Sequence, residues 1–183
     1  MTNGLILHGT QGSPEGNWFP WLKKQLEIKG YKVWVPKLPG SDKPQLKQYT
    51  KYIFGNKDWQ FDSESIVIGH SSGAVAALAL LNELPKNSVI NTCILVAIFE
   101  KNSPGGAWEP NTNLFNYTFD LVKIKKQAKK FIIFASDNDP YCPLLYAQNL
   151  AKELGGKIVV VEGAGHFNED SGYKKFPLLM KYL

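Results

Sequence analysis

Cysteines and long apolar runs are scarce in this 183-residue chain. Its 2 cysteines lack CxxC spacing, so they offer neither a disulfide framework nor a zinc knuckle. The longest uninterrupted apolar runs, residues 74–81 and 93–99, are far shorter than the roughly 20 residues of a membrane-spanning helix. The first residues carry no basic segment ahead of an apolar stretch. We therefore expect no signal peptide, no membrane partner and a reducing, cytoplasmic location.

Motifs that bind nucleotides, nucleic acids or metals are missing as well. The first loop reads GTQG rather than GxGxxG, and no GK[ST] phosphate loop occurs. The net charge is +5, and the densest basic stretch, residues 123–130, directly precedes an apolar run, as a solvated lysine face before a buried strand would. The 3 histidines form no HxxxH pair. We expect no nucleic-acid partner, no metal and no organic cofactor.

What the chain does have is the composition of an ordinary globular domain, with 44% hydrophobic and 20% charged residues. Its length suits one hydrophobic core, and neither a repeat nor a linker-like change of composition interrupts it. The sequence therefore predicts a single domain over residues 1–183.

Short β-branched runs alternate with helical patterns along the chain, which is typical of parallel strands connected by crossover helices. Each run is continuously apolar, which predicts that every strand lies in the interior of the sheet. The pattern predicts a three-layer α/β fold with a mostly parallel sheet of about six strands and helices on both faces. The expected strands are residues 4–8, 31–36, 65–69, 92–98, 130–136 and 157–162. The expected helices run from about 17 to 30, 45–54, 71–84, 143–154 and from about 173 onward.

The connection of residues 99–121 is unusually long for a compact domain. It is rich in Asn, Gly and Pro and has little periodicity. Loops of this length usually shape a site. Its aromatic residues Trp108 and Phe115, together with Trp18 from the first helical segment, are candidate walls of a substrate pocket.

The sequence GHSSG at residues 69–73 stands where a predicted strand turns into a predicted helix. This G-x-S-x-G pattern places a serine on a sharp, strained turn. Strand and helix can approach each other there only if the residues two before and two after the serine lack side chains, and Gly69 and Gly73 satisfy this demand. Ser71 is therefore the candidate nucleophile.

A serine hydroxyl needs a base within hydrogen-bond distance, and that base needs a third group to orient it. His166 lies in a glycine-rich turn after the last strand, at the carboxyl edge of the sheet where sites are built. Asp137 and Asp139 follow the fifth strand, and either could be the acid. The order Ser71, Asp139, His166 is the one that an α/β-hydrolase topology imposes.

A tetrahedral oxyanion needs backbone N–H donors. The amide of Ser72, at the helix N-terminus, supplies one. We expect the second to be the amide of Thr10, because the glycine-bracketed turn after the first strand can bring it toward Ser71. We expect His8, at the start of that turn, to be structural.

Four motifs together resemble the α/β-hydrolase superfamily: HGTQG after the first strand, GHSSG at the turn, SDNDPYCP after the fifth strand and GAGHF after the sixth. More narrowly, residues 8–39 are similar to the small serine hydrolases related to retinoblastoma-binding protein 9 and the bacterial YdeN-type proteins. The resemblance covers essentially the whole chain. It implies that the acid is the aspartate of a D-P-x-x-P-like turn, here Asp139, and that any lid is minimal because only residues 99–121 could form one.

The resulting hypothesis is a serine hydrolase that cleaves a carboxylic ester, or alternatively an amide, of a small molecule through an acyl-enzyme on Ser71. The competing hypothesis is a protein-interaction module on a hydrolase scaffold, since a fold does not dictate a function. An activated serine distinguishes the two.

Overall fold

The computed structural model describes residues 2–183, and its strands form one sheet in the order β2-β1-β3-β4-β5-β6. All of the neighbouring strands in this sheet run parallel. The strands are β1 (Thr2–Leu7), β2 (Tyr31–Trp34), β3 (Ile66–His70), β4 (Ile90–Val96), β5 (Ala128–Ser136) and β6 (Lys157–Val161).

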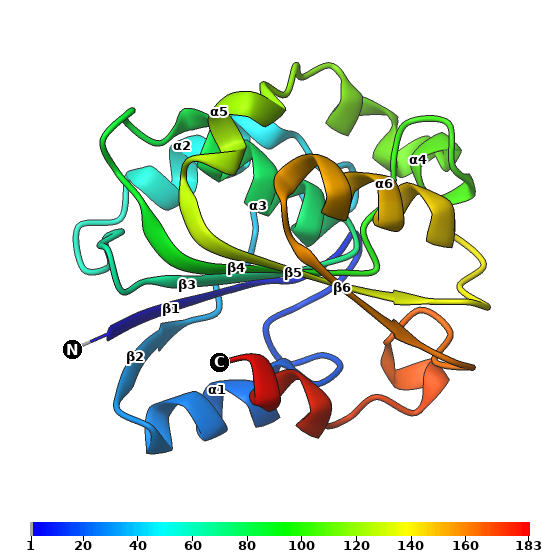
Figure 1. Ribbon diagram of the computed structural model, residues 1–183, viewed down its shortest axis with the longest axis horizontal. Helices are drawn as coiled ribbons and strands as arrows, with labels where there is room; N and C mark the ends of the chain where they lie inside the picture. Colours follow the sequence, from blue (N-terminus) through cyan, green and yellow to red (C-terminus); the bar gives the residue numbers. More distant parts are fainter. Residues whose placement is uncertain (1) are drawn as a thin grey trace.

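Helices cover both faces of the sheet (Figure 1). The helix α1 and the C-terminal 3-10 helix η3 lie on one face, whereas α2, α3, α5 and α6 lie on the other. This arrangement confirms the predicted three-layer α/β fold. The α-helices are α1 (Phe19–Ile28), α2 (Leu46–Phe54), α3 (Ser72–Glu83), α4 (Pro104–Ala107), α5 (Leu121–Lys125) and α6 (Leu144–Leu154). The 3-10 helices are η1 (Glu109–Phe115), η2 (Glu169–Ser171) and η3 (Pro177–Tyr182).

The prediction that all six strands lie in the sheet interior is wrong for β2 and β6. These strands pair on one side only, and their residues are partly or fully exposed. An open sheet has two edges, and an apolar run records how well its two faces are covered, not whether a second strand lies beside it. The prediction is right for β3, whose residues are all buried.

Two further segments differ from the sequence prediction. The expected C-terminal helix from about residue 173 is a 3-10 helix that begins only at Pro177, after a turn that Gly172 closes in a left-handed conformation (φ 87°). Residues 99–121 contain α4 and η1, which begin at or next to a proline and pack against each other. Proline suits the first turn of a helix, because the N–H that it lacks would have no partner within the helix there. The connection is therefore compact and forms no extended lid. We call its residues 104–115, from the start of α4 to the end of η1, the cap segment.

The topology of the sheet decides where a site can form. The chain moves from β1 to β2 on one side and then to β3 on the other, so the strand order reverses between β1 and β3. Ligand sites in open parallel sheets lie at the carboxyl ends of strands beside such a reversal. Ser71 follows β3 at this position, and Thr10 lies in the loop that follows β1. Within residues 2–183, no helix is long and apolar enough to cross a lipid bilayer.

Candidate active site

Ser71 occupies a strained turn between β3 and α3. Its backbone has φ 57° and ψ −126°, a conformation that residues with a side chain rarely adopt. The flanking glycines make the turn sterically feasible. A Cβ at Gly69 would lie 2.3 Å from the carbonyl oxygen of Gly73, and a Cβ at Gly73 would lie 2.3 Å from that of Leu7. Strand and helix therefore meet only because both positions lack a side chain.

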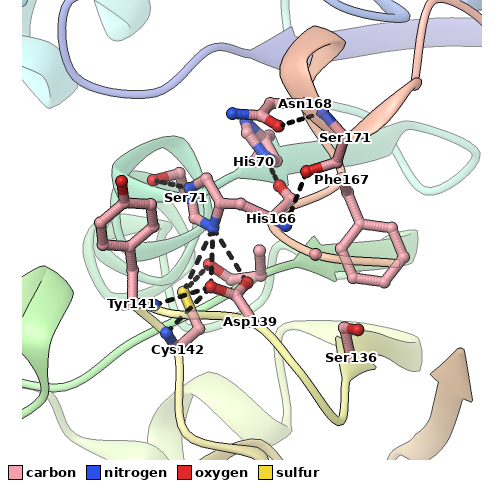
Figure 2. Close-up of polar contacts among 12 residues, drawn as sticks. His70, Ser71, Ser136, Asp139, Tyr141, Cys142, His166, Phe167, Asn168 and Ser171 are labelled. Carbon is pink, nitrogen blue, oxygen red and sulfur yellow. Dashed lines mark hydrogen bonds and ion pairs between the residues drawn. The ribbon is translucent and has the colours of Figure 1, made fainter. Parts of the chain in front are cut away.

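Ser71, His166 and Asp139 form a continuous line of polar contacts (Figure 2). The Ser71 Oγ lies 3.1 Å from His166 Nε2, and His166 Nδ1 lies 2.9 Å from Asp139 Oδ2. The Asp139 side chain is 1% exposed and the His166 side chain 11% exposed, so the aspartate is shielded while the imidazole still reaches the cavity. The amides of Tyr141 and Cys142 donate to Asp139 Oδ1 and fix the orientation of the carboxylate.

Asp137, the other candidate acid, has a different contact. Its Oδ1 accepts a hydrogen bond of 2.8 Å from the Gly163 amide, which joins the end of β5 to the loop after β6. That loop carries His166. The geometry thus pairs Asp139 with the imidazole and leaves Asp137 to tie two loops together.

The His70 side chain contacts the backbone of His166. Its Nε2 lies 2.8 Å from the carbonyl oxygen of His166 (Figure 2). A carbonyl can only accept, so Nε2 carries the proton and Nδ1 is the unprotonated nitrogen. Burial, together with the nearby His166, lowers the pKa of His70 to about 3. His70 is therefore a neutral clamp on the loop that presents His166.

His8 performs the equivalent task for the loop after β1. Its Nδ1 donates to the Gly9 carbonyl at 2.8 Å, and its Nε2 accepts from the Leu38 amide at 3.1 Å. The side chain is fully buried, and this burial lowers its pKa. The expected structural histidine therefore anchors the loop that carries Thr10.

The amides of Thr10 and Ser72 lie on the two segments that flank Ser71. Gly9 brings the first loop close, because a Cβ there would lie 3.0 Å from the Ser71 Cβ. Within residues 2–183, neither of the two amides donates a hydrogen bond to a protein acceptor. Two unengaged N–H groups on the segments next to a serine are suited to bind an oxyanion.

Comparison with known proteins shows the family of this chain. The family model of the serine hydrolases matches residues 4–183. This chain belongs to the serine hydrolase family. YdeN of Bacillus subtilis is 28% identical over 178 residues, which span 97% of this chain and 92% of YdeN. The serine hydrolase RBBP9 of Rattus norvegicus is 28% identical over 169 residues, 91% of this chain and 87% of that protein.

The crystal structure of the ydeN gene product from B. subtilis superposes with a TM-score of 0.91 at 27% identity, covering 100% of this chain and 96% of that one. The predicted resemblance and the α/β-hydrolase fold are thereby confirmed.

The candidate site opens into a cavity of about 800 Å³. Trp108, 45% exposed, lines this cavity as the sequence suggested. Trp18 does not, because it is fully buried and donates its indole N–H to the Phe167 carbonyl at 2.9 Å. Phe115 packs against the core and the ring of Phe99 instead of lining the cavity. The sequence pattern could not separate core aromatic residues from cavity residues.

The cavity walls include residues that the sequence analysis missed. Tyr141 lies edge-on to His166, with ring centroids 4.9 Å apart, and Asn111 is buried at the cavity wall. A signal for Tyr141 existed, because it directly follows the Asp139-Pro140 turn. For Asn111 the only signal was its place in the unusually long connection. The other polar residues that line the cavity are Gln11, Asn17, Asn168 and Asp170.

One group of side chains in this site has the composition of a metal centre. The ligand atoms of Asp139, Cys142 and His166 all lie within 4.8 Å of one another. His166 Nδ1 already faces Asp139 at 2.9 Å, and the Cys142 Sγ donates to the Ala97 carbonyl at 3.0 Å. Burial, together with nearby Asp139, raises the pKa of the Cys142 thiol well above its usual value. The imidazole and the carboxylate thus face each other, the thiol is bonded to a backbone carbonyl, and a protonated thiol is a poor metal ligand.

Proposed function

We propose that this serine hydrolase is a carboxylesterase-like enzyme that cleaves a small carboxylic ester through an acyl-enzyme on Ser71. The observation that carries the proposal is the line of contacts from Ser71 Oγ through His166 to Asp139. Ser71 and His166 line an accessible cavity. An amide is the alternative substrate for the same machinery.

Each residue of the line has one task in this mechanism. His166 removes the proton of Ser71 as Oγ attacks the acyl carbon, and it then passes that proton to the leaving alcohol. Asp139 holds the imidazole in the tautomer with its proton on Nδ1 and stabilises the imidazolium. The amides of Thr10 and Ser72 stabilise the oxyanion. A water molecule then attacks the acyl-enzyme while His166 takes its proton, and His166 returns that proton to Ser71 Oγ as the acid leaves.

The cavity supports a small substrate with a polar part. Trp108 and Tyr141 offer aromatic surfaces, 45% and 48% exposed, on which an acyl chain or aromatic group could pack. Asn168 and Asp170, two and four residues beyond His166, offer polar partners for the leaving group. Trp18 and Phe115 have no part in this proposal. We further propose the cytoplasm as its location, because Cys93 and Cys142 are unpaired thiols.

A fluorophosphonate probe tests the proposal directly, because it reacts with activated serines. We expect intact-mass analysis to show one probe per chain and peptide mapping to place it on Ser71. Ser71→Ala should remain folded and unlabelled, whereas Ser63→Ala, at an exposed serine in the turn before β3, should still be labelled. Comparing the rates at which the same preparation hydrolyses short acyl esters and the matching amides then distinguishes ester from amide preference.

Absence of labelling in a folded protein would reject the enzyme and favour the protein-interaction module. Labelling that persists in Ser71→Ala would reject the assignment of the nucleophile.

A further inference from the structure

The cap segment, residues 104–115, is joined to the oxyanion side of the site by a chain of buried polar groups. Asn111, on η1, is 2% exposed, and its Nδ2 donates to the Gly105 carbonyl at 2.7 Å. Its Oδ1 therefore faces the other way, where it contacts the Thr10 hydroxyl. The Thr10 Oγ1 in turn lies 2.8 Å from the Oγ of Ser72, which is fully buried.

The protons of this chain can be assigned without ambiguity. Asn111 Oδ1 can only accept, so the single hydroxyl proton of Thr10 is donated to it. The Ser72 hydroxyl must then donate to Thr10 Oγ1. The chain continues beyond Asn111, because the Gly105 amide donates to the Tyr141 carbonyl at 3.0 Å. A single run of hydrogen bonds thus joins α3, the loop after β1, the cap segment and the loop that carries Asp139.

The Thr10 side chain holds one end of the peptide that carries the Thr10 amide. The neighbouring backbone is anchored by bonds from Gln11 N to the Ser41 carbonyl at 2.9 Å and from Gly12 N to the Gly9 carbonyl at 3.0 Å. The amide of Thr10 itself donates no hydrogen bond within the described chain, whereas the carbonyl of the same peptide, that of Gly9, accepts from His8 Nδ1 at 2.8 Å and from Gly12 N at 3.0 Å. The hydroxyl of Thr10, held from both sides, fixes the Cα end of that peptide.

We propose that Asn111 and the hydroxyl of Thr10 are positioning residues, which hold the Thr10 amide at the place where the oxyanion of the proposed reaction forms. The inference rests on the proposed function for its catalytic part only. It gives the unusually long connection a task, since η1 then holds a catalytic loop in place. Asn111 acts through Thr10, because its Oδ1 and one of its N–H groups are bonded within the protein.

The test compares Thr10→Val and Asn111→Leu with two matched controls. Thr10→Ser keeps the hydroxyl. Thr112→Val makes the same change as Thr10→Val at an exposed residue of η1, whose hydroxyl bonds only to the Glu109 carbonyl. Measurements are kcat and KM for an acetate ester, the inhibition constant of an arylboronic acid that forms a tetrahedral adduct on the nucleophile, and hydrogen–deuterium exchange of residues 8–12.

We expect Thr10→Val and Asn111→Leu to lower kcat about tenfold to hundredfold, with KM changed by no more than about threefold. The boronic acid should bind more weakly by a similar factor, and residues 8–12 should exchange faster. The double variant should be little worse than either single variant, because both break one chain. Thr10→Ser, which keeps the hydroxyl, should lose less kcat than Thr10→Val, and Thr112→Val should behave like the wild type.

Wild-type kcat and wild-type exchange in a folded Asn111→Leu variant would overturn the proposal, as would equal losses in Thr112→Val. If the wild type neither turns over the ester nor reacts with a fluorophosphonate, the proposed function fails by itself. Exchange of residues 8–12 in Asn111→Leu then decides the positioning role, and unchanged exchange rejects it.

Discussion

The three histidines of the chain have three different tasks, and their hydrogen-bond partners distinguish them. His8 and His70 each lie close to a backbone carbonyl and are buried, so each stays neutral and holds a loop. His166 alone lies between a carboxylate and a serine hydroxyl. Two neutral clamps therefore support one candidate base.

Exchanging each of the two aspartates for asparagine should affect turnover very unequally. Asp139→Asn should lower kcat by about 10³-fold to 10⁴-fold, because an amide facing Nδ1 favours the wrong tautomer of His166. Asp137→Asn keeps an oxygen that can accept from the Gly163 amide, so its kcat should stay within about tenfold of the wild type. Steady-state kinetics on one ester measures both. Similar losses in the two variants would contradict the assignment of Asp139.

The buried His70 should make the protein less stable in acid. Its pKa is about 3 in the folded chain and about 6.5 when unfolded. Below about pH 6.5 the unfolded chain binds a proton that the folded chain refuses. The free energy of unfolding should therefore fall by on the order of 1.4 kcal/mol per pH unit as the pH drops toward 3, and it should be at its full value above 6.5.

Urea denaturation at several pH values measures this effect by comparing the wild type with His70→Gln. We expect the glutamine variant to be less stable at neutral pH and to lose less stability in acid. The carboxylates and His8 titrate in both proteins, so parallel curves would show that His70 makes no contribution.

At the scale of elements, the turn between β3 and α3 depends on the absence of two side chains. Gly73→Ala would place a methyl group 2.3 Å from the Leu7 carbonyl oxygen and 2.5 Å from the His8 carbonyl oxygen, and these backbone atoms leave it no room. We expect this substitution to lower the free energy of unfolding by about 3 kcal/mol or more, or to prevent folding. Gly16→Ala is the matched control, because its nearest neighbour would be 3.6 Å away. Thermal denaturation of both variants gives the answer, and equal stability would contradict the steric argument.

The elements show which parts of the structure a sequence can predict. The GHSSG turn was predictable because local steric demands fix both its residues and its place after a strand. The edge strands were not, because periodicity reports face coverage and carries no information on pairing partners. Trp18 was assigned to the pocket since its aromatic character is the same in a core and in a cavity wall. Asn111 was missed because its partner Thr10 lies 101 positions away along the chain.

At the scale of the whole molecule, residues 2–183 fold around one six-stranded sheet. Residues 104–115 are held by internal hydrogen bonds and line one wall of the cavity. Substrate can then enter and product can leave without a large movement of the chain.

Turnover should therefore be insensitive to solvent viscosity. We expect kcat for a short ester to change little when sucrose raises the relative viscosity about threefold, because chemistry and not lid opening limits the rate. Stopped-flow or steady-state assays in sucrose measure this, with a polymeric crowder as control for nonspecific effects. A kcat that falls in proportion to viscosity would show that a conformational step or product release limits turnover.

The positive φ of Ser71 also bears on how such a sequence persists. A residue with a side chain in this conformation costs about 1–3 kcal/mol, and glycine would relieve most of that cost. A lineage with no further use for the hydroxyl would thus be one substitution away from a more stable fold. Selection for stability alone would therefore favour glycine at this position.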